Sequence, residues 1–239
     1  MFGFAILVML FLGMLTWFIG STFIKNRKLL AALTLTTMLM NSGAYGLSLN
    51  RLAFGDEALA YASLYFVGMV MLSYTIGVIV ASLGTVGWKE AVLELIKIPT
   101  IYAMALGFIF ITFGWQLPEP LMISISSLSD AAIPGLLVLL GVQLQKLQGS
   151  SLQLGPLLFA NLMRLGGGLV FGFMVSAVLG LESVAHQAGV VESAMPTAVT
   201  SIVLATEYDV EPDFVTMVVF TSTLLSPLTL TPLLFYLSL

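Results

Sequence analysis

The chain has 239 residues and a formal net charge of −4, with 59% hydrophobic and 8% charged residues and a mean hydropathy of +1.08. Soluble domains contain roughly 45–50% apolar and about 25% charged residues, so this composition excludes a soluble protein and indicates an integral protein of the lipid bilayer. The short charged loops contain no basic stripe, which excludes a nucleic-acid partner, and the lack of cysteine excludes disulfides and thiol chemistry.

Eight apolar spans follow one another along the chain, each near the length of about 20 residues that a transmembrane helix needs. They lack the alternation of about ten residues that is typical of membrane barrels. A loop at 50–57 separates the second and third spans, and the connection 84–97 has the spacing of a short interfacial helix. The sequence therefore predicts an all-α polytopic membrane protein with helices at about 1–23, 29–49, 58–82, 98–117, 121–144, 158–181, 184–206 and 214–237.

Two of these spans carry a polar interruption at their centre. The second contains Asn41-Ser42-Gly43-Ala44-Tyr45-Gly46, where Asn and Ser compete for backbone hydrogen bonds and Gly lowers helix propensity. The seventh contains the stretch from Glu192 to Ser201, in which Pro196 removes a donor and clashes with the carbonyl four residues back. We expect both helices to break; for the seventh, the alternative is a kink with hydroxyls bonded back to the helix.

Broken helices at membrane depth form the sites of many transporters, because freed carbonyls attract cations and half-helix N-termini attract anions. Spans one to three and six to eight share one layout, with the broken helix in the middle, and they begin on opposite sides of the membrane. The sequence thus predicts an inverted repeat whose broken helices run antiparallel and cross near the midplane, with Asn41 close to Pro196.

The basic residues predict the orientation, since Lys and Arg gather in cytoplasmic loops. Arg51 is assigned to the outer side, and Arg164 is interpreted as a residue that snorkels at the cytoplasmic end of the sixth span. Both termini are therefore predicted to lie outside the cell (plasma) membrane. The loops after spans one, three and five carry the remaining basic residues: Lys25, Arg27, Lys28, Lys89, Lys97 and Lys146.

Several separated motifs resemble one family of transporters. The runs 194–199, 204–208 and 223–232 resemble the C-terminal signature of the auxin efflux carrier family, and the runs 130–134 and 140–144 fit it as well. Residues 27–41, with Gly46 and Phe54-Gly55, resemble the first crossover helix of that family and the turn after it. The resemblance covers nearly the whole chain.

The resemblance implies ten helices in two inverted repeats, of the sodium/proton antiporter or bile-acid symporter type, with a moving transport domain and a scaffold that makes the dimer contact. The first two helices of that pattern have no counterpart here, so we expect either a homodimer of a reduced form or missing N-terminal helices. By this mapping, 1–83 and 146–239 hold the transport-domain helices of the first and second repeats, 84–97 is a cytoplasmic interfacial loop, and 98–145 holds the scaffold helices.

The resemblance also implies a secondary transporter or facilitated carrier that moves a small organic anion, auxin-like or a carboxylate, by alternating access and without a cofactor. No basic residue is placed at the midplane, so attraction is expected from the half-helix N-termini near Gly43 and Thr197. For Asn41 the alternative is a hydrogen bond between helices. The predicted substrate contacts are Asn41, Ser42, Gly43 and Tyr45 in the first repeat and Met195, Pro196 and Thr197 in the second.

Asp130 and Glu192 are placed at membrane depth, where an ionisable group is costly and marks function. Each is a candidate for proton coupling or gating, and the alternative is a carboxyl held by neighbouring hydroxyls. An enzyme is not expected, because no Ser/His pairing, HExxH motif or Asp dyad is present at suitable spacing. A channel-like permease and a truncated, inactive fragment of a carrier remain as alternatives.

Overall fold

The computed structural model describes residues 1–97, 99–146 and 153–238. Residue 98, at the predicted start of the fourth span, lies outside the described residues, as do 147–152, between the fifth and sixth spans, and residue 239. Within the described part, all regular secondary structure is helical, apart from one isolated β-bridge. This confirms the predicted all-α class.

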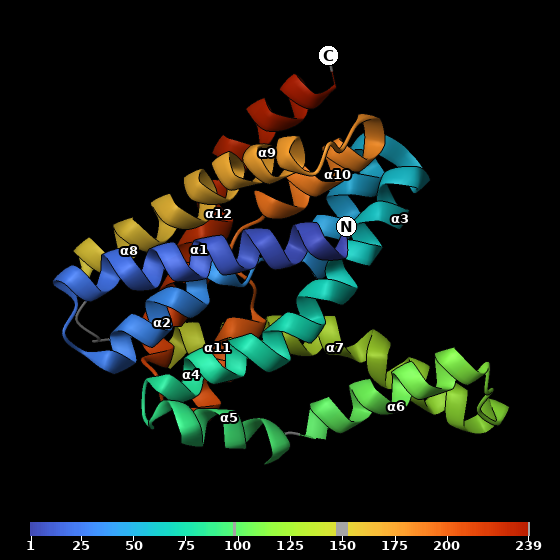
Figure 1. Cartoon of the computed structure of the whole chain (residues 1–239), viewed down its shortest axis with the longest axis horizontal. Helices are drawn as coiled ribbons and strands as arrows, with labels where there is room; N and C mark the ends of the chain where they lie inside the picture. Colours follow the sequence, from blue (N-terminus) through green and yellow to red (C-terminus); the bar gives the residue numbers. More distant parts are fainter. Residues whose placement is uncertain (98, 147–152, 239) are drawn as a thin grey trace.

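The helices follow the chain as Figure 1 shows. The first half contains α1 (Phe2–Phe23), α2 (Arg27–Met38), the π-helix η1 (Ser42–Leu47), α3 (Ser48–Leu72), the π-helix η2 (Ser73–Gly77), α4 (Val78–Leu83) and α5 (Trp88–Lys97). The second half contains α6 (Pro99–Phe113), α7 (Glu119–Lys146), α8 (Leu154–Asn161), the π-helix η3 (Leu162–Gly167), α9 (Gly168–Val178), α10 (Ser183–Ser193), α11 (Thr200–Glu207) and α12 (Pro212–Leu237).

Four helical stretches of the described chain have the length and apolar composition to cross a membrane. They run over Phe2–Phe23, Ser42–Leu83, Leu154–Val178 and Pro212–Leu237, and Ile101–Phe113 is a shorter apolar helix. The predicted second and seventh spans are each interrupted at the centre, and the second half of the second span continues directly into α3. The structure therefore supports a helical membrane protein with several spans.

The helix α2 lies at the centre of the molecule, with every residue from Leu29 to Met38 buried. It begins at Asn26, whose side-chain oxygen accepts hydrogen bonds from the amides of Lys28 (2.9 Å) and Leu29 (3.4 Å), as an N-cap residue does. The helices α1, α4, α8 and α12 pack around it. Because so little of α2 is exposed, its C-terminal end lies deep inside the protein.

The predicted loop at 50–57 is wrong in part, since η1 continues into α3 through this region. Gly55 has a φ of 83° and interrupts the helix, a conformation that glycine adopts without steric cost. Asn50 stays helical and donates from Nδ2 to the carbonyl of Gly46 (3.0 Å). Asn50 therefore turns inward, whereas Arg51 and Asp56 of the same segment stay exposed and form an ion pair.

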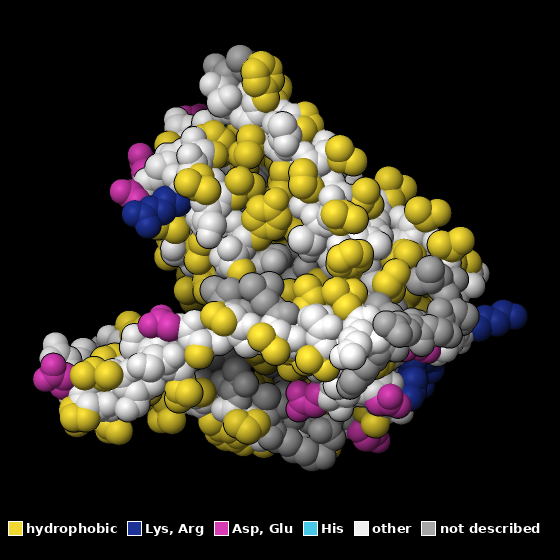
Figure 2. All heavy atoms as spheres, turned by 180° about the vertical axis from the view of Figure 1, so that it is seen from behind, with side chains coloured by type: hydrophobic (Ala, Val, Ile, Leu, Met, Phe, Trp, Pro, Cys, Tyr) yellow, Lys and Arg dark blue, Asp and Glu magenta, His cyan; other side chains and the backbone are white. Residues whose placement is uncertain are grey.

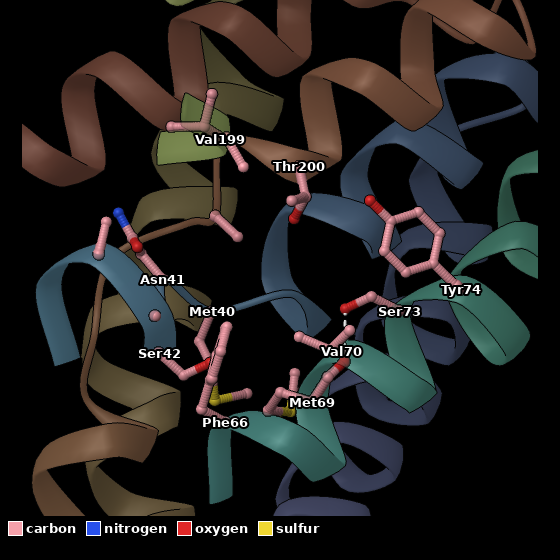
Figure 3. A pocket seen from close by; sticks show the side chains of 14 residues that line it. Met40, Asn41, Ser42, Phe66, Met69, Val70, Ser73, Tyr74, Val199 and Thr200 are labelled. Carbon is pink, nitrogen blue, oxygen red and sulfur yellow. Dashed lines mark hydrogen bonds between the residues drawn. The ribbon is translucent and has the colours of Figure 1, made fainter. Parts of the chain in front are cut away.

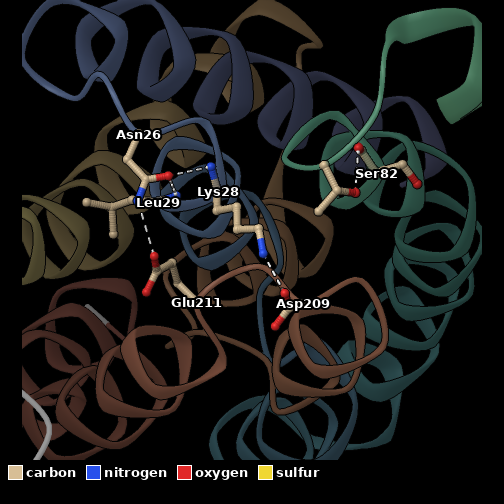
Figure 4. A network of polar contacts seen from close by, with 7 residues as sticks. Asn26, Lys28, Leu29, Ser82, Asp209 and Glu211 are labelled. Atoms are coloured by element: carbon tan, nitrogen blue, oxygen red, sulfur yellow. Dashed lines mark hydrogen bonds and ion pairs between the residues drawn. The ribbon is translucent and has the colours of Figure 1, made fainter.

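Three connections meet at one end of the molecule. Asn26 Nδ2 donates to Glu211 Oε1 (3.3 Å), and Lys28 forms an ion pair with Asp209 (Figure 4). Arg27 Nη2 donates to the carbonyl of Val86 (3.3 Å). These connections follow the predicted spans one, three and seven, which all end on the side that the positive-inside rule assigns to the cytoplasm.

The helices α6 and α7 project from the remaining helices as an arm (Figure 1). Seen from behind, the arm carries many hydrophobic side chains on its surface (Figure 2). Ile111 is 82% exposed on α6 and Leu128 is 75% exposed on α7. The arm corresponds to the predicted scaffold helices.

Candidate functional site

The two broken helices meet at their interruptions. The amide of Asn41 donates to the carbonyl of Pro196 (2.8 Å), and the amide of Ala198 donates to the carbonyl of Leu39 (2.9 Å). Met40 and Thr197 face each other as an isolated antiparallel bridge between these bonds. Each segment thus satisfies backbone groups that the other has freed, as burial away from water requires. The predicted approach of Asn41 to Pro196 is confirmed.

Pro196 forms only one backbone hydrogen bond with Asn41 in this bridge. Antiparallel residues in a hydrogen-bonded pair normally exchange two bonds, but proline has no N–H to return to Asn41. The carbonyl of Asn41 instead accepts from the amide of Gly46 (3.0 Å), which spans the five-residue step of a π-helix. The proline therefore leaves the Asn41 carbonyl free to start η1.

Side chains hold the crossing from both sides. Thr197 Oγ1 donates to the carbonyl of Thr36 (2.8 Å), and the amide of Thr197 donates to Ser222 Oγ of α12 (3.2 Å). The hydroxyl of Tyr65 lies 2.6 Å from Sδ of Met40. The crossing is thereby connected to α2, α3 and α12.

A cavity of about 270 Å³ adjoins the crossing. The first residues of η1 and α11 lie on its wall, namely Ser42, Gly43, Ala44 and Thr200 (Figure 3). A helix N-terminus carries partial positive charge and free amides. Two such ends at one cavity favour an anionic group there.

The opposite wall comes from α3 and η2, which sequence reasoning missed. Phe66, Met69 and Val70 are its apolar part, and Ser73 and Tyr74 are its polar part. These positions follow the i, i+3, i+4, i+7, i+8 spacing of one helix face. That periodicity, together with two hydroxyls inside an apolar span, was the signal in the sequence. The cavity therefore pairs an apolar wall with hydroxyls and helix ends.

The predicted substrate contacts divide into two groups. Asn41, Ser42 and Gly43 line the cavity, and a β-carbon at Gly43 would overlap the ring of Phe66. Tyr45 is half-buried within η1 and is not among the lining residues. Met195, Pro196 and Thr197 are buried in the crossing itself and also do not line the cavity; the second break contributes its later residues Ala198, Val199 and Thr200 instead.

The two candidate carboxyls have different surroundings. Asp130 is exposed on α7, although its neighbour Ala132 lines the cavity. Glu192 is fully buried in the last turn of α10, and its Oε1 accepts from Asn50 Nδ2 (3.0 Å). Gly46 packs against this carboxyl so closely that a β-carbon there would overlap it. Within the described chain, Glu192 Oε2 and Asn50 Oδ1 have no hydrogen-bond partner.

The interpretation of Arg164 as a snorkelling residue at the surface is wrong. The side chain is fully buried in η3, where Nη1 donates to the carbonyl of Thr37 (2.6 Å) and Nη2 donates to the carbonyl of Ser193. The expectation that no basic residue lies at the midplane rested on this placement, whereas Arg164 contacts both broken helices. The position of Arg164 near the end of its predicted span could not reveal this burial, because η3 turns the side chain toward the interior.

The comparisons with known proteins find relatives among membrane transporters. Residues 82–234 match the model of a family described as membrane transport protein. The chain is 27% identical over 224 residues to an uncharacterized transporter of Methanocaldococcus jannaschii, a match that covers 91% of this chain and 72% of that protein. A second uncharacterized transporter, from Methanothermobacter thermautotrophicus, is 30% identical over 202 residues, or 81% of this chain and 64% of that protein.

Plant proteins match a shorter part of the chain. Auxin efflux carrier component 1 of Arabidopsis thaliana is 31% identical over 144 residues, which cover 57% of this chain and 23% of the plant protein. The chain therefore spans about two thirds of the archaeal relatives and a quarter of the plant carrier. These relatives are named as transporters and carriers, not as enzymes.

Proposed function

Because the chain belongs to the membrane transport protein family of the auxin efflux carriers, we propose that it is a secondary transporter or facilitated carrier for a small organic anion. The observation that carries this proposal is the cavity at the crossing, on which the N-terminal ends of η1 and α11 converge. Those ends favour the anionic group, and Asn41 and Ser42 supply directed hydrogen bonds to it.

The cavity wall supports an anion with an apolar body. Phe66, Met69 and Val70 offer an apolar surface opposite the helix ends, and such a surface favours burial of a ring or an alkyl group. No Lys or Arg lines the cavity in the part of the chain that the structure describes. A monocarboxylate of auxin-like shape therefore fits better than a dicarboxylate, which needs a second anionic subsite.

We propose alternating access for this transport, with eight spans in an inverted repeat. The breaks at 39–41 and 194–199 are the corresponding parts of the two repeats, and the hydrogen bonds between them support this arrangement. Residues 1–83 and 146–239 form the moving domain, 98–145 form the scaffold of a homodimer, and both termini face outside the cell membrane. The exposed apolar arm supports the scaffold assignment.

Glu192 is the better supported candidate for proton coupling. It is buried beside the crossing with one carboxyl oxygen unpartnered among the described residues, and a buried ionisable group at membrane depth is functional by default. Asp130 remains a gating candidate, since α7 reaches the cavity at Ala132. Tyr45, Met195, Pro196 and Thr197 support the site from behind in this proposal.

Transport is tested with purified protein in liposomes. We expect saturable uptake of indole-3-acetate or benzoate, little uptake of succinate, and none of choline. Asn41→Ala and Ser42→Ala should each weaken binding about tenfold, since a hydrogen bond to a charged group contributes roughly 1.5–3 kcal/mol. Ser48→Ala is the matched control, because Ser48 is exposed at the start of α3, six residues further along the chain.

The alternatives give different results in the same assay. A channel-like permease shows no counterflow when unlabelled anion is placed on the far side, whereas a carrier does. An inactive fragment shows no uptake although the anion still binds. Uptake of choline without uptake of any carboxylate would contradict the assignment.

A further inference from the structure

The guanidinium of Arg164 joins the ends of two half-helices. Thr37 lies in the last turn of α2 and Ser193 is the last residue of α10, and their carbonyls accept from Nη1 and Nη2 respectively. The last carbonyls of a helix lack partners within the helix and carry partial negative charge. One cation thus satisfies both C-terminal ends that stop at the crossing.

Two glycines of α9 pack closely against this contact. A β-carbon at Gly168 would overlap both the guanidinium of Arg164 and the carbonyl of Ser193, and one at Gly172 would overlap the hydroxyl of Ser193. Glycine at these positions lets η3 and α9 approach the end of α10 closely. Arginine suits this place better than lysine, because its planar fork reaches two acceptors at once.

Glu192 also lies at the C-terminal end of α10. It precedes Ser193, and its carboxyl turns toward Asn50 and Gly46. The only ion pairs among the described residues are Lys28–Asp209 and Arg51–Asp56, so neither Glu192 nor Arg164 has a direct charged partner there. The two buried side chains therefore lie at the same C-terminal end of α10.

The helices packed against α10 bring few other titratable groups to its C-terminal end. They are α1, α3, α9, α12 and η1, and neither α1 nor α9 contains a titratable side chain. Tyr65 of α3 is fully buried, and Arg164 of η3 donates to the carbonyl of Ser193, the residue after Glu192. The other titratable side chains of these packed elements are Tyr45, Arg51, Asp56, Glu57, Tyr61, Asp213 and Tyr236, all at least partly exposed.

We propose that Arg164 is a positioning residue that clamps the crossing and makes anion binding depend on protonation of Glu192. This inference rests on the proposed function as an anion carrier. When Glu192 is ionised, its charge balances that of Arg164. When Glu192 takes a proton from water, the positive charge is left unbalanced at low dielectric and favours an anion in the adjacent cavity. One proton then accompanies each monocarboxylate, and no net charge moves.

Binding of benzoate or indole-3-acetate to purified protein between pH 5 and 8 tests the coupling. Wild type should bind more weakly as the pH rises. Glu192→Gln should hold the low-pH affinity across the range, whereas Arg164→Gln should lose at least tenfold in affinity together with the pH dependence. Arg164→Lys keeps the charge and should retain the pH dependence. Arg51→Gln removes an exposed Arg and is the matched control.

A stability cycle tests the charge balance without any ligand. Because breaking a buried charge balance costs more than removing both charges, the melting temperature of Arg164→Gln/Glu192→Gln should lie above the value expected from adding the two single losses. The double variant also serves if Arg164→Gln does not fold. Additive losses, or an Arg164→Gln variant with wild-type affinity and pH profile, would overturn this inference. If wild type binds no anion while the cycle shows coupling, the proposed function fails and the charge balance stands.

Discussion

At the scale of single residues, Asn50 and Asn161 form a natural pair for comparison. Each donates from Nδ2 to the carbonyl four residues earlier, Gly46 at 3.0 Å and Leu157 at 2.9 Å. The second acceptor differs: Asn50 donates to the Glu192 carboxyl at 3.0 Å, and Asn161 to the Thr221 hydroxyl at 2.9 Å. The pair therefore separates a bond to a carboxyl from a bond to a neutral group.

Asn50→Leu should destabilise the protein more than Asn161→Leu. Hydrogen bonds to charged groups contribute roughly 1.5–3 kcal/mol and neutral ones about 0.5–1.5 kcal/mol, and Asn50→Leu also leaves Glu192 Oε1 without its donor. Melting temperatures in detergent measure the difference. Equal losses in the two variants would show that the contact with Glu192 contributes nothing beyond an ordinary bond.

The sequence revealed some of these residues and concealed others. Asn41 and Glu192 were found because a polar residue in an apolar span is conspicuous when its span is interrupted. Asn50 was hidden in a predicted loop, and Arg164 was assigned to a surface, since both assignments rested on the distance from a span end. Which way a side chain turns depends on packing that one sequence does not specify.

At the scale of elements, the bridge between Met40 and Thr197 makes a sharp prediction. The two residues form the non-hydrogen-bonded pair of the bridge, for which Cα atoms lie about 4.5 Å apart, within the range of a disulfide. The variant Met40→Cys/Thr197→Cys should therefore oxidise to an internal disulfide. Protection of both thiols from maleimide after mild oxidation measures it, in a chain without native cysteine.

Met40→Cys paired with the exposed Thr206→Cys is the control, since Thr206 lies at the end of α11, away from the bridge. If both pairs remain equally open to maleimide, the crossing does not hold in solution. If the disulfide forms, indole-3-acetate transport in the oxidised protein reports whether the crossing must open during the cycle.

The positions of the two helix breaks were predictable from the sequence, but their backbone conformations were not. Proline and the Asn-Ser-Gly run indicated where helical hydrogen bonding stops. The extended pairing of 39–41 with 196–198 arises from long-range contact, and the π-helix that follows depends on the Asn41 carbonyl that proline leaves free. Local sequence determined the interruption, and the partner segment determined its geometry.

At the scale of the whole molecule, the connections before α2, before α5 and before α12 meet at one end. The positive-inside rule predicts that this end is cytoplasmic. Trp88→Cys, at a position 67% exposed on α5, should then resist an impermeant maleimide in intact cells and react after permeabilisation. Leu52→Cys, at a position 85% exposed near Arg51, should react from outside. Labelling in the reverse pattern would contradict the orientation.

The arm of α6 and α7 leads to a prediction about assembly. If the arm forms the dimer contact, Ile111→Cys on α6 should cross-link between copies in liposomes, and light scattering should give twice the mass of the chain. Leu228→Cys, at a position 74% exposed on α12, is the control. A monomeric mass together with no cross-link at Ile111 would exclude the homodimer.

The crossing also has a consequence for how the chain is made. Thr36 belongs to the first broken helix, yet its carbonyl accepts from a threonine that is 161 positions further along. At a synthesis rate of roughly 5–20 residues per second, that partner leaves the ribosome about 8–30 s later. Throughout that interval the open backbone of the first break must be held by water, by the insertion machinery or by a temporary neighbour. The assembly of this protein is therefore most vulnerable while it is half synthesised.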